Sequence, residues 1–317
     1  MEPEFEVLTM GRIGVDVYPH QIGVGLEDVT SFGKFLGGSA TNVAVAAARY
    51  GRRSAVVTKV GADPFGRFAR KALAGYAVSD RFVGESAHLP TPVTFCEIFP
   101  PDHFPLYFYR APKAPDLDIT PDEVDFDAVR AADVFWVTVT GLCQEPSRTA
   151  TLAALEARGR RGTTVLDLDY RPMFWTSREE ARQWVGRALE LVTVTAGNLD
   201  ECETAVGLRD PHEAAKALRD RGVSLAVVKQ GPRGVLAVDD DGDVEVPPVP
   251  VEVVNGLGAG DAFGGALCHG LLSGWDTRRT VEFANAAGAH VAGELSCADA
   301  MPTEAQVLAR LAAVAGV

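Results

Sequence analysis

Asn255-Gly-Leu-Gly-Ala-Gly-Asp-Ala-Phe263 is the stretch that decides the fold expected for this sequence. Its glycines alternate with small residues, and the pattern after it predicts an apolar helix with Phe263, Leu267 and Leu271 on one face. A glycine-rich turn that leads into a helix directs unpaired N–H groups and the positive end of the helix dipole at one point, which favours an anion. The stretch therefore predicts a phosphate-binding turn at the start of a helix.

Asp261 lies at the mouth of this turn, where the helix dipole favours its ionised form. A carboxylate beside bound phosphate can accept the proton of an attacking hydroxyl during phosphoryl transfer. The alternative is that Asp261 only caps the helix, but a cap does not explain the glycines around it. We predict that Asp261 is a general base and that the backbone N–H groups of Gly258, Ala259 and Gly260 hold the transferred charge.

Other phosphate and nucleophile motifs are incomplete in this sequence. Gly61-Ala-Asp-Pro-Phe-Gly-Arg67 lacks the lysine and the hydroxyl residue of a P-loop. Gly11-x-x-Gly14 fails the dinucleotide-binding pattern, which argues against a Rossmann dehydrogenase. Gly37-Gly-Ser-Ala-Thr41 lacks the last glycine of a hydrolase nucleophile elbow. The same glycine pair leads instead to Asn42, whose amide can bind a polyol. The alternative is that the pair only forms a tight turn into the helix and that Asn42 makes only local contacts.

The hydrophobic pattern predicts one α/β domain over residues 1–317, with a parallel sheet and a small β lid. A hairpin is expected at 91–112 and an irregular, glycine-rich segment at 15–36, and together these form the lid. Apolar, β-branched runs alternate with helical stretches, which is typical of βαβ units. The expected strands are 5–10, 54–60, 134–139, 163–168, 191–195 and 224–228, and the expected helices begin near 39 and span 65–74, 261–272 and 279–293.

The composition excludes several kinds of partner. The net charge of −13, from 30 Lys and Arg against 43 Asp and Glu, argues against nucleic acid and weakly against anionic membranes. The five cysteines form no Cys-x-x-Cys pair, and the first residues lack the regions of a signal peptide. No apolar run approaches the roughly 18 residues of a membrane helix. We therefore expect a cytoplasmic protein with reduced thiols.

The two glycine motifs resemble the two signatures of the PfkB, or ribokinase-like, carbohydrate kinases. These are Gly37-Gly38-x-x-x-Asn42 and Gly258-Ala-Gly-Asp261, and the resemblance runs from about residue 7 to about residue 303. It implies a three-layer fold with a central, mostly parallel sheet, and ATP and Mg²⁺ as cofactors. Longer stretches, such as Leu166-Asp-Leu-Asp-Tyr-Arg-Pro-Met-Phe-Trp175, are similar to the branch that transfers the ATP γ-phosphate to the C6 hydroxyl of 5-dehydro-2-deoxy-D-gluconate in myo-inositol catabolism.

The resemblance also implies a set of substrate-binding residues. They are Asp16, Gly37, Gly38, Asn42, Tyr107, Arg110 and Arg171. Asp16 matches an acid that binds sugar hydroxyls, and Arg171 matches a residue that binds a substrate carboxylate in related keto-acid kinases. Arginine suits this role because it pairs with a carboxylate through two parallel hydrogen bonds. The alternatives are that Arg171 only neutralises Asp167 and Asp169, and that Arg110 is a solvated charge on the lid.

On the nucleotide side, the resemblance implies Asn198, Lys229, Gly231, Gly258, Gly260 and Asn285, with Glu201 reaching the metal through water. Asn198 and Glu201 also have the spacing of a helix capping box, and both roles can hold at once. Many relatives have Asp-Thr where this chain has Asn255-Gly256, and that Asp helps to hold a monovalent cation. A K⁺ requirement is therefore an open question.

Three alternatives remain at this level. The same fold could phosphorylate 2-keto-3-deoxygluconate, fructose or a nucleoside, or it could be a silent sugar-binding regulator, although the intact Asp261 and glycine turn argue against the last. A redox enzyme is the most distant alternative. The aromatic hairpin could bury against the lid of a second copy or cover its own substrate, and of these two we favour a homodimer through the lid.

Overall fold

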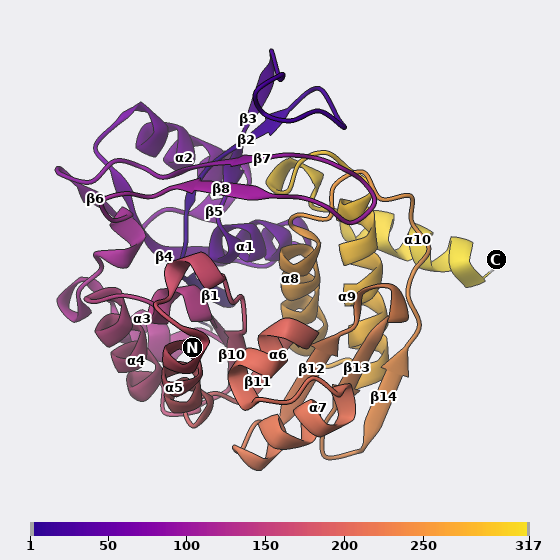
Figure 1. The fold of residues 1–317 in the computed structure, drawn as a ribbon. Helices are drawn as coiled ribbons and strands as arrows, with labels where there is room; N and C mark the ends of the chain where they lie inside the picture. Colours follow the sequence, from indigo (N-terminus) through magenta and orange to yellow (C-terminus); the bar gives the residue numbers. More distant parts are fainter. Residues whose placement is uncertain (1–2, 316–317) are drawn as a thin grey trace.

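The computed structural model describes residues 3–315, which form a central sheet between two layers of helices, with a second, smaller sheet beside one edge (Figure 1). The strand order in the central sheet is β14-β13-β12-β11-β10-β9-β1-β4-β5, and β6 also pairs with β4. Its strands are β1 (Val7–Met10), β4 (Ser54–Gly61), β5 (Val78–Ser79), β6 (Val83–Ser86), β9 (Val134–Thr138), β10 (Thr163–Asp167), β11 (Val194–Asn198), β12 (Leu225–Lys229), β13 (Val235–Val238) and β14 (Asp243–Val246).

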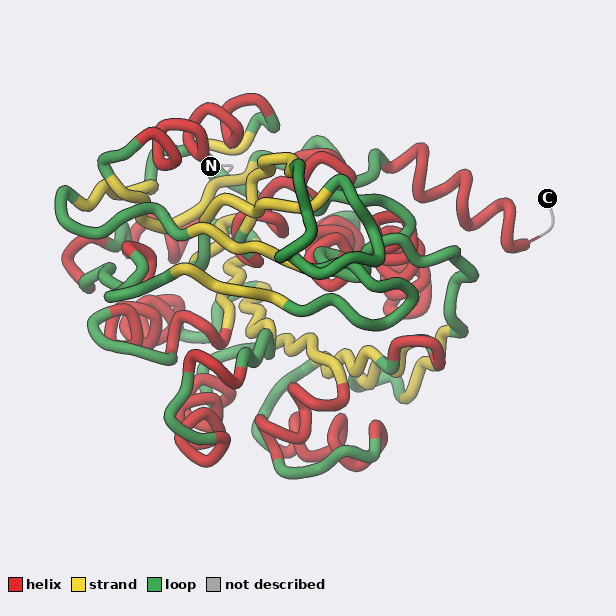
Figure 2. The backbone as a smooth tube through the Cα atoms, turned by 45° about the horizontal axis from the view of Figure 1, so that its top comes forward, coloured by secondary structure: helices red, strands yellow, loops and turns green. Residues whose placement is uncertain are grey.

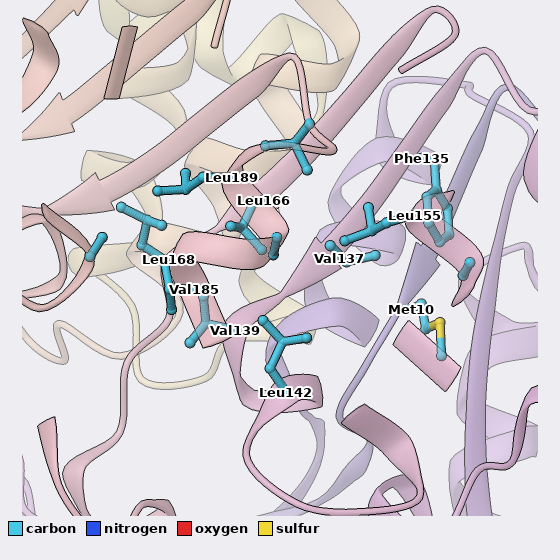
Figure 3. Close-up of a cluster of buried hydrophobic side chains, with 14 of the residues drawn as sticks. Met10, Phe135, Val137, Val139, Leu142, Leu155, Leu166, Leu168, Val185 and Leu189 are labelled. Atoms are coloured by element: carbon cyan, nitrogen blue, oxygen red, sulfur yellow. The ribbon is translucent and has the colours of Figure 1, made fainter. Parts of the chain in front are cut away.

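The central strands are buried on both faces, as expected for parallel strands covered by helices. Side chains alternate between the two faces, so that Phe135 and Val137 of β9 pack into one cluster while Val134 and Trp136 pack into the other. Figure 3 shows part of the first cluster, in which side chains of the sheet meet Leu155 and other residues of the covering helices. This two-sided burial explains why the strands read as continuous apolar runs.

The helices divide between the two faces of the sheet. One face carries α3 (Phe126–Ala131), α4 (Ser147–Arg158), α5 (Arg178–Leu189), α6 (Leu199–Val206) and α7 (Pro211–Asp220). The other carries α1 (Ser39–Arg49), α2 (Pro64–Gly75), α8 (Ala259–Leu272), α9 (Thr277–Ala292) and α10 (Glu304–Ala315). None of the helices within residues 3–315 is long and apolar enough to span a membrane.

The second sheet, called the lid sheet below, has the order β3-β2-β7-β8. Its strands are β2 (Gly14–Pro19), β3 (Phe32–Gly37), β7 (Val93–Cys96) and β8 (Leu106–Tyr109). β2 follows β1 almost directly, and β3 leads directly into α1, so the lid sheet is joined closely to the central sheet. Figure 1 shows its strands beside α1 and α8, and Figure 2, in which the top of Figure 1 comes forward, shows strands crossing the upper part of the molecule.

The predicted α/β class, with a mostly parallel central sheet, flanking helices and a small β lid, is confirmed. The sheet ends with two antiparallel strands, β13 and β14, which the pattern did not predict. The chain also has a third C-terminal helix, α10, where only two were expected. The strand predicted at 191–195 instead spans Val194–Asn198, because Leu191 and Val192 belong to the turn after α5.

The direction of the chain reverses beside β1. It builds β4 and β5 on one side of β1 and then crosses to β9 and the strands beyond it on the other. In open α/β sheets, ligands bind at the carboxyl ends of the strands near such a switch point. Residues that directly follow β1 and β10, or that end β11 and β12, therefore lie where a site is expected.

Candidate active site

A polar cavity lies between the carboxyl ends of the central strands, the start of α8 and the inner face of the lid sheet. The lid sheet contributes Thr94, Leu106 and Phe108, and the loop before α8 contributes Gly256, Leu257, Gly258 and Gly260. The remaining polar lining side chains are Arg12, Asp16, Tyr18, Ser39, Asn42, Asp167, Asp169, Arg171, Asn198, Glu201, Lys229 and Asp261. Most residues predicted from the two glycine motifs are thus brought together here.

The start of α8 places Asp261 beside the predicted phosphate turn. Gly258 precedes the first helical residue, Ala259, and has a left-handed backbone with φ of 80°. A Cβ at Gly258 would overlap the side chain of Cys297, so both backbone and space require glycine here. The N–H of Leu257 donates to Oδ1 of Asn255 at 3.1 Å, which fixes the turn from within.

Asn42 holds the carboxylate of Asp261 in place. Its Nδ2 donates to Oδ2 of Asp261 at 2.8 Å, and Asn42 is itself buried within α1. Burial raises the pKa of Asp261 to about 6, against the opposing effect of the Asn42 hydrogen bond. A carboxylate with this pKa is ionised at neutral pH and is more basic than an exposed aspartate, which suits proton abstraction.

Asp16, on β2, lies in the same cavity and is accommodated by the glycine pair. Oη of Tyr18 donates to Oδ2 of Asp16 at 2.8 Å, and burial raises the pKa of Asp16 to about 6. A Cβ at Gly37 would overlap the Asp16 carboxylate, and one at Gly38 would overlap the backbone of Arg12. The glycine pair therefore makes room for the acid and brings α1 close to the strand end.

Asp169 is shared by two guanidinium groups. Its Oδ2 accepts from Nη2 of Arg12 at 2.6 Å, and its Oδ1 lies 2.8 Å from Nη2 of Arg171. The hydroxyl of Thr140 also donates to Asp169. Burial acts to raise the pKa of Asp169, but the two guanidinium groups outweigh it and hold the pKa at about 2. Asp169 is therefore a fixed anion within the cavity.

Lys229 forms a second cationic position, at the end of β12. A Cβ at Gly260 would lie 3.2 Å from its Nζ, so the ammonium group lies beside the glycine turn. Burial acts to lower the pKa of Lys229, but Glu201, Asp167 and other nearby acids raise it, so the side chain stays charged. Burial also raises the pKa of Asp167 to about 8, against the opposing effect of Lys229. A positive group beside unpaired helix N–H groups suits a phosphate.

Asn198 and Glu201 form the capping box of α6 and also line the cavity. Glu201 accepts from the N–H of Asn198 at 2.7 Å, and Asn198 accepts from the N–H of Glu201 at 3.0 Å. No group of three or more His, Cys, Asp or Glu side chains within residues 3–315 is arranged to hold a metal ion. This donor set fits Mg²⁺ held mainly by nucleotide phosphates and water, with Glu201 within reach of the water shell.

Six predicted residues do not line this cavity: Gly37 and Ala259, which are chain neighbours of lining residues, and Tyr107, Arg110, Gly231 and Asn285. Tyr107 alternates with Leu106 and Phe108 along β8, so it points to the opposite face of the lid sheet, where its hydroxyl donates to Glu97. Arg110 is held by Asp116 at 2.7 Å, away from the cavity lining. Gly231 begins a 3₁₀ turn and has φ of 58°, and Asn285 on α9 donates to the carbonyl of Pro247.

The sequence prediction missed several residues of the site. Arg12, Asp167 and Asp169 directly follow or end central strands, and that position at the carboxyl edge of the sheet was the available signal. Tyr18 lies two residues after Asp16 on the same face of β2, so alternation along the strand places both in the cavity. Cys297 carried no local signal, because only the packing of its loop against Gly258 brings it there.

One cavity under the β lid holds Asp261, the glycine turn before α8 and a second buried acid, Asp16. This arrangement is the one expected of a sugar kinase with the ribokinase-like fold. The model of the pfkB family carbohydrate kinases matches residues 5–304, and the chain belongs to this family. It is a carbohydrate kinase, which acts on ATP with a metal ion.

Relatives in sequence and neighbours in structure are similar to nearly the whole chain. The chain is 31% identical to a 5-dehydro-2-deoxygluconokinase of Geobacillus kaustophilus, covering 95% of this chain and 92% of that protein. A putative ribokinase II of E. coli, solved with ATP and Mg²⁺, superimposes with a TM-score of 0.87 at 22% identity, covering 98% and 99%. A double mutant of fructokinase from Vibrio cholerae O395, with fructose, ADP and potassium bound, gives 0.87 at 26% identity, covering 98% and 99%.

Proposed function

We propose that this chain transfers the γ-phosphoryl group of ATP to the C6 hydroxyl of 5-dehydro-2-deoxy-D-gluconate, a step of myo-inositol catabolism. The observation that carries the proposal is the Asp261 carboxylate, held by Asn42 beside the glycine turn in a cavity that also contains two guanidinium groups. The guanidinium groups favour an acidic sugar over a neutral one. The name shared by the relatives supports the same substrate.

In the proposed reaction, Asp16 and Asn42 bind sugar hydroxyls, the Gly37–Gly38 turn lies against the sugar, and Arg171 binds the carboxylate. Asp261 accepts the proton of the C6 hydroxyl while the C6 oxygen of the sugar forms a bond to the γ-phosphorus. The bond between that phosphorus and the β–γ bridging oxygen breaks, and ADP leaves. Positioning and electrostatics do most of the work in such transfers.

The glycine turn and Lys229 bind the transferred charge. The backbone N–H groups of Gly258, Ala259 and Gly260 at the start of α8 would donate to it, and each such donor is worth about 3 kcal/mol of transition-state stabilisation. Asn198 and Gly231 lie toward the phosphates and ribose, and Asn285 toward the adenine. Glu201 would hold Mg²⁺ through a water molecule, and the bound ion would neutralise phosphate charge. Closure of the lid sheet over the sugar excludes water, which would otherwise accept the phosphoryl group.

The decisive assay compares acceptors. Mg²⁺-dependent ADP release is measured with 5-dehydro-2-deoxygluconate, 2-keto-3-deoxygluconate and fructose, and the product of the best acceptor is examined by ³¹P NMR for the phosphorylated carbon. A clear preference for the first compound, phosphorylated at C6, is expected. A preference for either of the others would keep the kinase assignment and refute the proposed substrate.

The proposal includes an expectation about a monovalent cation. Asn255 is fully buried, and its amide donates to the carbonyl of Leu295 and accepts from Leu257, so it brings no negative charge to a cation site. Equal activity in KCl and NaCl is therefore expected, and activation by K⁺ alone would contradict this.

We also propose that two copies associate through the outer face of the lid sheet, where Tyr107 is 43% and Tyr109 66% exposed. Burying such large aromatic side chains favours association. Sedimentation of the wild-type chain and of Tyr109→Lys tests this: a dimer that the substitution weakens is expected. A wild-type monomer would refute it.

A further inference from the structure

Two guanidinium groups of the cavity share one carboxylate. Arg12 and Arg171 both bind Asp169, through Oδ2 and Oδ1. Arg171 also lies 3.8 Å from Glu201, but Arg12 pairs only with Asp169 among residues 3–315. A buried donor of a charged group that lacks a hydrogen-bond partner is costly, so an anion bound beside Arg12 would stabilise this arrangement.

Arg12 keeps hydrogen-bond donors free. It is only 8% exposed, and it lines the cavity. Its Nη2 donates to Asp169, while its buried Nε has no hydrogen-bond partner, and Nη1 makes no hydrogen bond within the described part of the chain. An arginine presents its donors in a planar fork that matches a carboxylate. Asp169 thus holds the group in place and leaves part of the fork for a ligand.

Arg12 lies on the side of the cavity that faces the lid sheet, where the sugar is expected. Its guanidinium carbon lies 5.8 Å from the ring centre of Phe108, on the lid sheet. Lys229 instead lies beside Gly260 and the phosphate turn. Arg12, Lys229 and Asp261 all line the same cavity. A sugar whose hydroxyl reaches Asp261 would place its far end at Arg12.

We propose that Arg12 binds the carboxylate of the sugar acid together with Arg171, and that it determines the preference for acidic over neutral sugars. Asp169 is the positioning residue that holds both guanidinium groups toward the ligand. This inference rests on the proposed function only in taking the sugar site as the place where the carboxylate binds. Neither family motif includes Arg12.

A binding measurement tests the inference without turnover. D-Gluconate and D-glucitol differ only at C1, which is a carboxylate in the first and a hydroxymethyl group in the second, and their dissociation constants are measured by calorimetry. Arg12→Gln is expected to weaken gluconate binding roughly 10- to 100-fold, the effect of losing hydrogen bonds between charged groups, and to leave glucitol binding nearly unchanged. Arg67→Gln, which removes the same charge from the exposed surface of α2, serves as the matched control.

The outcomes separate the inference from the proposed function. If Arg12→Gln weakens both ligands equally, or neither, the inference is wrong, whatever the acceptor assay shows. If wild type prefers gluconate and Arg12→Gln removes that preference, the inference holds even when 5-dehydro-2-deoxygluconate proves not to be the best acceptor. Arg12→Lys, which keeps the charge but loses the fork, should recover part of the preference, and it replaces the glutamine variant if that variant does not fold.

Discussion

Asn42→Ala tests the link between Asp261 and its hydrogen-bond donor. The structure gives Asp261 a pKa of about 6, with the Asn42 hydrogen bond acting to lower it, so kcat/KM should rise with pH through an acid limb near that value. A hydrogen bond to a charged group is worth about 1.5 kcal/mol, and 1.36 kcal/mol corresponds to one pKa unit. Removing the amide should therefore move the acid limb up by about one unit.

The assay is kcat/KM for the sugar between pH 5 and pH 9. With a limb one unit higher, the ratio of variant to wild-type rate should be about fivefold lower at pH 6 than at pH 8.5, where both carboxylates are ionised. Tyr18→Phe is the matched control, because it removes the donor to Asp16, whose pKa is also about 6, and leaves Asp261 untouched. If the acid limb of kcat/KM moves with Tyr18→Phe and not with Asn42→Ala, the titrating group is Asp16, and the assignment of the limb to Asp261 is refuted.

Four further substitutions test other features of the structure. The pKa of Asp261 is raised from 3.8 to about 6 in the folded protein, so stability should fall as pH rises across that interval. Asp261→Asn should therefore melt at a higher temperature than wild type at pH 8, with the difference vanishing towards pH 4; no gain at pH 8 would contradict this. Gly38→Ala should lower the free energy of unfolding in denaturant titrations by at least about 1–3 kcal/mol, because its φ is 103° and a Cβ would overlap the Arg12 backbone; a neutral effect would be inconsistent with this turn. Arg110→Ala should lower the free energy of unfolding by about 3–5 kcal/mol in the same titration, because it leaves Asp116 buried without its partner. Tyr107→Phe should change neither the free energy of unfolding nor the KM for the sugar, because its hydroxyl contacts Glu97 on the outer face of the lid sheet. A raised KM in the tyrosine variant with stability unchanged would return Tyr107 to the substrate site.

Most of the fold could be predicted, because the sequence patterns that indicate it lie within short stretches of the chain. Buried parallel strands such as β9 and β12 read as continuous apolar runs, and the glycine turn at 256–260 identifies the start of α8. The antiparallel pair β13 and β14 escaped prediction, since its strands have only four residues each and one is largely exposed. Short edge strands owe their conformation to the neighbouring strand more than to their own sequence.

The site could be predicted only in part, for a related reason. Asn42 and Asp261 belong to glycine motifs, and the motifs themselves point to a ligand. Arg12 and Asp169 are 157 residues apart in the sequence, and only the adjacency of strand ends in the sheet brings them together. Arg110 is the reverse case: a cationic residue on the lid hairpin suggests a ligand, whereas the structure pairs it with a nearby buried acid, Asp116.

The most direct test of the account is phosphoryl transfer by wild type and Asp261→Asn, with ATP binding measured in parallel. A general base contributes roughly 10²- to 10⁴-fold in rate, so the variant should turn over at no more than about a hundredth of the wild-type rate while binding ATP with similar affinity. Turnover above that level would show that Asp261 is not the base. A parallel loss of ATP binding would show instead that it acts through the nucleotide site.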